Sequence, residues 1–230
     1  MTALQRPEIP SPKLRNETAM TAVSGIVDAI SFIALGHVFT ANMTGNIVFL
    51  GFAIGGVAGL SMWRSLLALT FFMSGAVLGG WMTRTMKPED PGSTPVHALA
   101  VETVLLWVAS AVSIGFRAPY EDNKLEIALV IALTAVVMGL RNAVVRKLGV
   151  PDLTTTVLTL TIAGFAADSS LAGGNNPRWG RRVAAVSAML TGAIAGTSML
   201  AYSVAVPLFV CGLMTAMCAL ARVHLSRKEL

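Results

Sequence analysis

Residues 29–63 read AISFIALGHVFTANMTGNIVFLGFAIGGVAGLSMW and carry no charged side chain. A second uncharged stretch covers residues 183–221. As a single helix this second stretch would be about 58 Å long, nearly twice the hydrocarbon thickness of a bilayer. Each stretch is therefore predicted to hold two membrane-spanning helices joined by a turn. The expected breaks are Gly36-His37 in the first stretch and Tyr202-Ser203, ahead of Pro207, in the second.

The composition of the whole chain agrees with this prediction. Of 230 residues, 54% are hydrophobic and 13% are charged, and the mean hydropathy is +0.70. A soluble domain carries about 25% charged residues, so the composition excludes an ordinary soluble enzyme and a disordered tail. The net charge of +5 comes from basic residues scattered between apolar segments. This pattern indicates a lipid bilayer as the surroundings and no nucleic-acid partner.

Hydropathy predicts an all-α polytopic bundle of about eight transmembrane helices, with six or seven as alternatives. The eight candidate spans lie near residues 18–36, 42–60, 64–83, 97–115, 125–145, 153–168, 180–199 and 203–221. Residues 1–17 and 222–230 are polar and are predicted to be cytosolic tails. With eight spans, twelve of the 17 Lys and Arg residues fall on the side of the termini. The excess of basic residues predicts that both termini are cytosolic.

The two halves of the chain share a series of short sequence matches. GIVDA at 25–29 aligns with GLRNA at 139–143, GFA at 51–53 recurs at 164–166, and SGAVLG at 74–79 aligns with TGAIAG at 191–196. The matches predict two repeats, 18–115 and 125–221, joined by a cytosolic connector at 116–124. Four helices in each repeat would make the halves parallel, with a pseudo-twofold axis along the membrane normal.

Asp28 and Arg141 are candidate functional residues because they are ionisable groups inside predicted spans. The repeat aligns Asp28 with Asn142, and Arg141 is the neighbour of Asn142. An ionised side chain at this depth is costly unless it is paired or faces water. We therefore predict an Asp28–Arg141 pair at the seam between the halves. The alternative is a purely architectural polar lock.

A second candidate group opens the second span, in the segment FTANMTGN at 39–46. Asn42 and Asn46 are four residues apart and share a helix face, and Thr155 and Thr159 repeat that spacing in the second half. Thr44 and Gly45 allow a broken helix start whose free amides could face a polar solute. We predict that these side chains line a solute path. Helix capping and interhelical hydrogen bonding are the alternative.

The remaining motifs favour packing over chemistry. Glycines four residues apart, at 51, 55 and 59, at 75 and 79, and at 192 and 196, are typical of close helix contacts, including contacts with a second copy of the chain. His37, His97 and His224 are scattered and form no metal or catalytic motif. Glu102 is interpreted as an interfacial or packing carboxylate. We expect neither an enzyme nor a bound cofactor or metal.

Two segments, GIVDAISF at 25–32 and VFTANMTGN at 38–46, resemble the YoaK-like family of small bacterial membrane proteins, a domain of unknown function. The string Phe-x-x-Asn-Met-Thr-Gly-Asn is the specific part of this resemblance. The resemblance implies a bacterial cytoplasmic membrane, a polytopic helical fold and about six spans. It implies no substrate. Asp28, Asn42, Thr44, Gly45 and Asn46 match the family signature.

Intramembrane polarity and the repeat together predict a secondary transporter of a small solute, with its polar site at the seam of the halves. Asp28 would couple a proton or cation, and Arg141 would be its partner or an anion anchor. The alternatives are a non-transporting scaffold or partner subunit and a small-ion channel.

Overall fold

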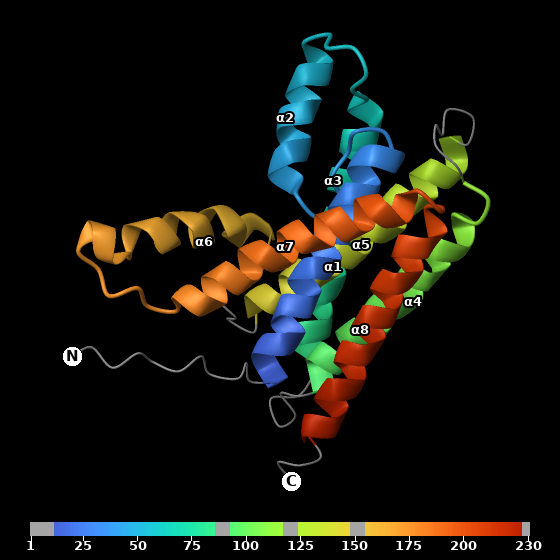
Figure 1. Cartoon of the computed structure of the whole chain (residues 1–230). Coiled ribbons are helices and arrows are strands. Elements are labelled where there is room, and N and C mark those ends of the chain that lie inside the picture. Colours follow the sequence, from blue (N-terminus) through green and yellow to red (C-terminus); the bar gives the residue numbers. More distant parts are fainter. Residues whose placement is uncertain (1–11, 86–92, 117–123, 148–154, 227–230) are drawn as a thin grey trace.

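The computed structural model describes residues 12–85, 93–116, 124–147 and 155–226 (Figure 1). Over these residues it consists of α-helices and one short 3₁₀ turn, so the predicted all-α polytopic class is confirmed. The elements are α1 (Pro12–Ala34), α2 (Met43–Ile54), α3 (Met62–Thr85), α4 (Ser93–Val112), α5 (Lys124–Lys147), α6 (Thr155–Ala167), η1 (Ser170–Ala172), α7 (Trp179–Leu200) and α8 (Ala205–Ser226). Breaks separate α1 from α2 and α7 from α8, at the two turns predicted from the uncharged stretches.

Five of the described helices are long and apolar enough to cross a bilayer. Helices α1, α3, α5, α7 and α8 each contain an apolar stretch of 19 residues or more. Helix α4 has 20 residues, which corresponds to about 30 Å and therefore to the hydrocarbon thickness. The hydrophobic core lies where these helices meet, and its largest fully buried side chains include Ile30, Leu35, Leu106, Ile131 and Met138.

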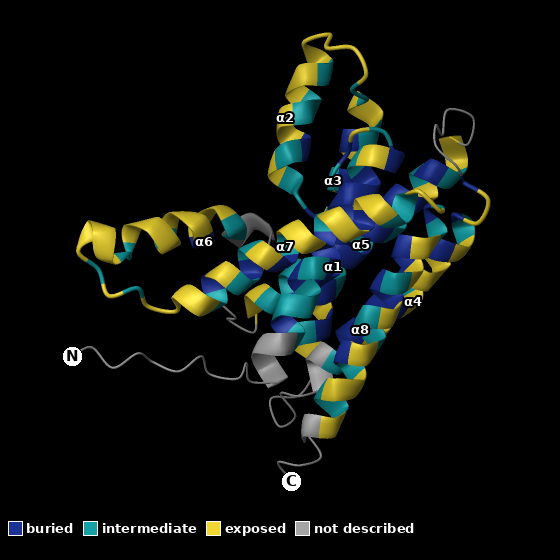
Figure 2. Ribbon diagram, viewed as in Figure 1, coloured by how far each residue is buried: buried dark blue, intermediate teal, exposed yellow. Residues whose placement is uncertain are grey.

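Helices α2 and α6 are too short to cross a bilayer. They contain 12 and 13 residues, which corresponds to about 18 and 20 Å. Both project from the bundle formed by the long helices (Figure 1), and their surfaces are largely exposed (Figure 2). The prediction that 42–60 and 153–168 are full spans is therefore wrong. Hydropathy overestimated the length of these two helices because it measures apolar character and not the length of the helix that forms.

Glycines bring two pairs of long helices into backbone contact. A Cβ atom added at Gly75 would collide with the Val136 carbonyl group of α5, and one added at Gly192 would collide with the Ala22 carbonyl group of α1. Gly139 of α5 lies equally close to the Phe72 carbonyl group of α3. These glycines are needed because the helix axes approach more closely than any side chain allows.

The same contacts give the relative directions of the helices. Gly75 meets Val136 and Gly79 meets Leu140, so α3 and α5 are parallel. Contacts of Gly192 and Gly196 show in the same way that α7 and α1 are parallel. By contrast, α4 and α8 are antiparallel, because Thr103 contacts Thr215 while Ser110 contacts Ala205.

In Figure 1, α1, α4 and α7 run upward and α3, α5 and α8 run downward. Three pairs of helices therefore run in opposite directions: α1 against α5, α3 against α7 and α4 against α8. Two parallel repeats would instead make the two helices of each pair run in the same direction, so the parallel relation of the halves stays a prediction. That prediction assumed four crossings between residues 25 and 139, whereas α2 has only 12 residues.

Candidate functional site

The most deeply buried ion pair in the described residues joins α5 to α4. Arg141 places Nη2 2.7 Å and Nε 2.9 Å from Oε2 of Glu102. The Arg141 and Glu102 side chains are 7% and 2% exposed. In such low-dielectric surroundings the two charges hold each other strongly, and either one alone would be destabilising.

Helix α1 supplies the remaining partners of this guanidinium group. Nη1 of Arg141 donates to the Met20 carbonyl oxygen at 3.1 Å and to Ser24 Oγ at 3.3 Å. Each of the three guanidinium nitrogens therefore has an acceptor. We call Ser24, Glu102 and Arg141 the central polar cluster. It ties α1, α4 and α5 together inside the bundle.

Asp28 does not pair with Arg141, so the predicted pair is wrong. Asp28 lies one helical turn beyond Ser24 on α1 and is 5% exposed. Its Oδ1 accepts a hydrogen bond from the Ala41 amide at 2.9 Å, and the amides of Thr40 and Asn42 also interact with the carboxyl group. The carboxylate thus holds the loop between α1 and α2, while Glu102 provides the counter-ion that Arg141 needs.

The segment 39–46 builds a compact corner at the start of α2. The Phe39 amide donates to Asn46 Oδ1 at 2.9 Å, and Asn46 Nδ2 donates back to the Phe39 carbonyl oxygen. Asn42 caps α2 by accepting a hydrogen bond from the Gly45 amide at 3.4 Å. A Cβ atom at Gly45 would strike the Phe39 ring, so the glycine is required there.

The corner also explains the aromatic residues of this segment. The Phe39 ring stacks on Phe32 of α1 and on Phe49 of α2, with ring centroids 5.3 Å and 5.5 Å away, and the Phe32 and Phe49 centroids are themselves 6.0 Å apart. Asn46 is fully buried and Thr44 is exposed. Asp28, Asn42, Gly45 and Asn46 are therefore brought together by the fold, and their observed contacts are with the protein's own backbone and with the side chains of Phe39 and Met43.

Apart from Arg141, the described candidates from the second half do not join either group. Asn142 Nδ2 donates to the Met138 carbonyl oxygen of its own helix at 2.8 Å. Thr159 is exposed on α6, and the side chain of Thr155 lies outside the described residues. Among the described side chains, Asn142 and Thr159 therefore do not join Asp28, Asn42 and Asn46 in the single lining that the repeat predicted.

Sequence reasoning missed Glu102 and Ser24 as partners of Arg141. A signal was present: Glu102 is an acidic residue within an apolar segment, as Asp28 is, and Arg141 had to pair with one of them. Only the packing of α4 against α5 decides between the two acids. Among the described residues, no group of three or more His, Cys, Asp or Glu side chains is arranged to hold a metal ion.

Comparison with known proteins identifies the family to which the chain belongs. A family model described as "Protein of unknown function (DUF1275)" matches residues 18–221. The chain is also similar to "UPF0700 transmembrane protein YoaK" of Bacillus subtilis (strain 168), with 38% identity over 147 residues. That match covers 64% of this chain and 63% of the relative. No solved structure matches the chain.

Proposed function

Since the chain belongs to the DUF1275 family of membrane proteins, we propose from its geometry that it is a secondary transporter built from two inverted halves. The observation that carries this proposal is the central polar cluster. A buried Arg–Glu pair between three membrane helices is costly to maintain, and ionisable groups at such positions commonly mark solute or proton paths. The pair joins α4 and α5, which belong to different halves.

The glycine contacts support the inverted repeat. Adding 114 to a residue number in α1 and 117 to one in α3 gives the matching position in α5 and α7. Under these offsets each glycine contact between α3 and α5 corresponds to an observed contact between α7 and α1. Gly75–Val136 corresponds to Gly192–Ala22, and Gly79–Leu140 corresponds to Gly196–Ile26. Gly139–Phe72 corresponds to Gly25–Met189. The same offsets relate the sequence matches at 25–29 and 74–79 to their partners. Three long helices in each half then give opposite orientations and a pseudo-twofold axis in the membrane plane.

The distribution of basic residues supports six crossings with both termini in the cytosol of a bacterial cytoplasmic membrane. Only Arg64, Arg117 and Lys124 then lie toward the external side. The other fourteen Lys and Arg residues lie toward the cytosol: 6, 13, 15, 84, 87, 141, 146, 147, 178, 181, 182, 222, 227 and 228. Fourteen cytosolic basic residues are a stronger positive-inside bias than the twelve that eight spans give. With six crossings the connector 116–124 would lie on the external side, opposite to the expectation from eight spans.

The corner at 39–46 adds a broken helix of the kind found in transporters. The chain leaves α1 at Ala34, turns through Gly36 and His37, which both have positive φ, and returns to Asp28. Asp28 lies six residues, or about 9 Å, back from the end of α1. Helix α2 therefore starts at a level inside the length of α1. Such discontinuous helices line the sites of many transporters.

The central polar cluster suggests how a bound solute or proton could change the contact between α4 and α5. A proton taken up by Glu102, or an anion bound to Arg141, would remove the attraction that joins α4 to α5. Arg141 would keep only its two neutral acceptors on α1, Ser24 and the Met20 carbonyl group. The contact between the two halves would be weakened at this point, as alternating access requires.

Flux into proteoliposomes tests the proposal. Purified protein is reconstituted with a pH-sensitive dye inside, and a panel of small anions, amino acids and sugars is added outside. We expect saturable uptake or proton movement with at least one solute, lost in Glu102→Gln. Glu126→Gln, which changes an acid in the first turn of α5, is the matched control. Flux that survives Glu102→Gln removes the cluster from the mechanism, and a silent panel argues against transport.

A scaffold role is the second candidate, and the two short helices favour it. Apolar side chains on α2 and α6 remain exposed, including Ile47 at 57%, Phe52 at 49% and Leu160 at 69%. A homo-oligomer or a partner subunit could cover these helices. Light scattering of the detergent-solubilised protein gives the number of copies, and conductance across a planar bilayer would instead indicate a small-ion channel.

A further inference from the structure

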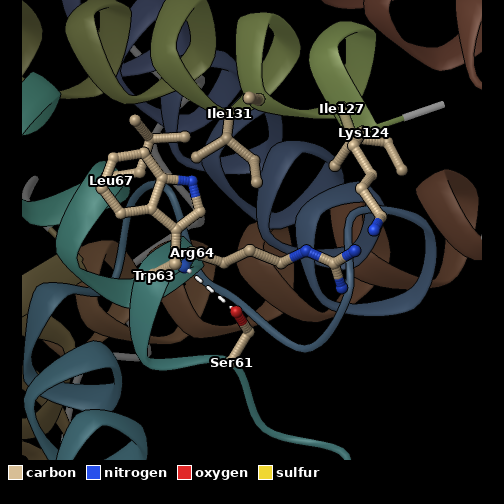
Figure 3. A pocket seen from close by; sticks show the side chains of 8 residues that line it. Ser61, Trp63, Arg64, Leu67, Lys124, Ile127 and Ile131 are labelled. Carbon is tan, nitrogen blue, oxygen red and sulfur yellow. Dashed lines mark hydrogen bonds between the residues drawn. The ribbon is translucent and has the colours of Figure 1, made fainter.

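A cavity of about 380 Å³ lies between the first turns of α3 and α5. Its walls are mainly apolar and comprise Leu67, Ile127, Ala128 and Ile131, with the Trp63 ring at one side (Figure 3). Two cationic side chains, Arg64 and Lys124, complete the lining together with Ser61. The cavity is therefore amphipathic, with positive charge beside a hydrophobic wall.

The two cations point toward the same part of the cavity. Figure 3 shows the Lys124 ammonium group directed toward the Arg64 guanidinium group. Within residues 12–85, 93–116, 124–147 and 155–226, no carboxylate forms an ion pair with either of them. Two like charges held close together repel each other, so a bound anion would be strongly favoured between them.

The backbone adds to this positive potential. Helices α3 and α5 are parallel, and both begin at the cavity, at Met62 and Lys124. The amino-terminal end of a helix carries partial positive charge. Two such ends, together with the two side chains, leave the cavity positive on the polar side and apolar on the other.

The other half of the molecule shows what a neutralised arginine looks like at the matching position. The offset of 117 relates Arg64 to Arg181, and the offset of 114 relates Glu17 to Ile131. Arg181 forms an ion pair with Glu17, Nη2 to Oε2, at 3.2 Å. Where α1 supplies Arg181 with an acid, α5 places Ile131 in the cavity wall near Arg64. The arginine is kept and its acid is replaced by an apolar surface.

We propose that this cavity binds an anionic phospholipid, with its phosphate between Arg64 and Lys124 and the upper part of an acyl chain along Leu67 and Ala128, next to the buried side chains of Ile127 and Ile131. The charge of the cavity selects a phosphate whose headgroup adds no positive charge. Its apolar wall selects a lipid over free phosphate. Trp63 is 66% exposed, a position suited to the membrane interface. This inference is independent of any transport activity.

Lipid binding to the purified full-length chain in nonionic detergent tests the proposal, measured by native mass spectrometry with phosphatidylglycerol, phosphatidylcholine or glycerol 3-phosphate. We expect retention of phosphatidylglycerol over the other two. Arg64→Gln and Lys124→Gln should each weaken it about fivefold, the contribution of one cation near an anionic lipid. Arg84→Gln and Lys147→Gln change cations at the opposite ends of the same two helices, so they should leave retention unchanged.

Ile131→Glu is the sharper variant, because it gives Arg64 the acid that Arg181 has. It should abolish selectivity for phosphatidylglycerol, and Ile131→Gln should not. Brominated phosphatidylglycerol should quench a protein with Trp63 as its only tryptophan, and Arg64→Gln should reduce that quenching. Equal retention of both lipids, an equal loss in the Arg84 and Lys147 controls, or tighter binding of glycerol 3-phosphate would each overturn the proposal.

Discussion

A single carboxylate oxygen of Glu102 on α4, Oε2, accepts two hydrogen bonds from Arg141 on α5. It lies 2.7 Å from Nη2 and 2.9 Å from Nε of the arginine. The pair connects the two halves of the chain, and both side chains are buried. Ser24 and the Met20 carbonyl group anchor the same arginine to α1. The junction of three helices thus depends on one charge and its counter-ion.

Removing one member of this pair should destabilise the protein more than removing both. Glu102→Gln or Arg141→Gln leaves a buried charge without its counter-ion, which costs about 3 to 5 kcal/mol. The double variant leaves no charge and should recover most of the loss. Thermal unfolding in detergent measures all three proteins. Additive losses in the double variant would show that the two residues do not interact.

Two adjacent glycines of α3 should respond oppositely to alanine. Gly79→Ala places a methyl group against the Leu140 carbonyl oxygen and should cost about 1 to 3 kcal/mol. An added Cβ atom at Gly80 meets nothing within 4 Å, so Gly80→Ala should be neutral or stabilising by up to about 1 kcal/mol. The same unfolding assay measures both. Similar effects at the two positions would contradict the parallel packing of α3 on α5.

The protein should be destabilised less by losing the charge of Asp28 than by losing its hydrogen-bond acceptor oxygen. Asp28→Asn keeps an acceptor for the Ala41 amide, whereas Asp28→Ala leaves that amide without it, at a cost of about 1 to 3 kcal/mol. Unfolding midpoints of the two variants separate these effects. If Asp28→Asn is as damaging as Asp28→Ala, the charge of Asp28 has a role beyond holding the corner.

Six crossings and eight crossings predict opposite sides for two exposed positions. In a variant lacking Cys211 and Cys218, Ala58→Cys should react with a membrane-impermeant maleimide from outside intact cells. Thr85→Cys should react only after the cells are opened. Both residues are exposed in the structure. The reverse pattern would restore α2 as a full span and overturn the inverted repeat.

Much of the fold could be predicted from the sequence because hydropathy is a local property. The uncharged stretches and the breaks at residues 36–37 and 202–203 lie where expected, as do the six long helices. The length of α2 could not be predicted in this way. Residues 55–60 are as apolar as a helix that crosses, but α2 ends at Ile54 and glycines at 56 and 59 adopt positive φ.

The candidate site, like the fold, could be predicted from the sequence only in part. That Asp28 and Arg141 needed partners follows from the cost of placing a charge in an apolar segment, and both are buried with polar partners. Which partner each has depends on contacts between residues far apart in the chain: Glu102 lies 39 positions from Arg141. No local pattern encodes that separation.

The amino-acid sequence alone was sufficient to establish a polytopic helical membrane protein and to locate its buried polar residues, because burial in lipid follows from composition along each segment. The tertiary structure was needed to determine that α2 and α6 stop short, that α3 packs parallel to α5 and α7 parallel to α1, and that Arg141 pairs with Glu102. Helix direction and ion pairing are decided by the packing of distant segments, and one span more or fewer reverses every helix that follows.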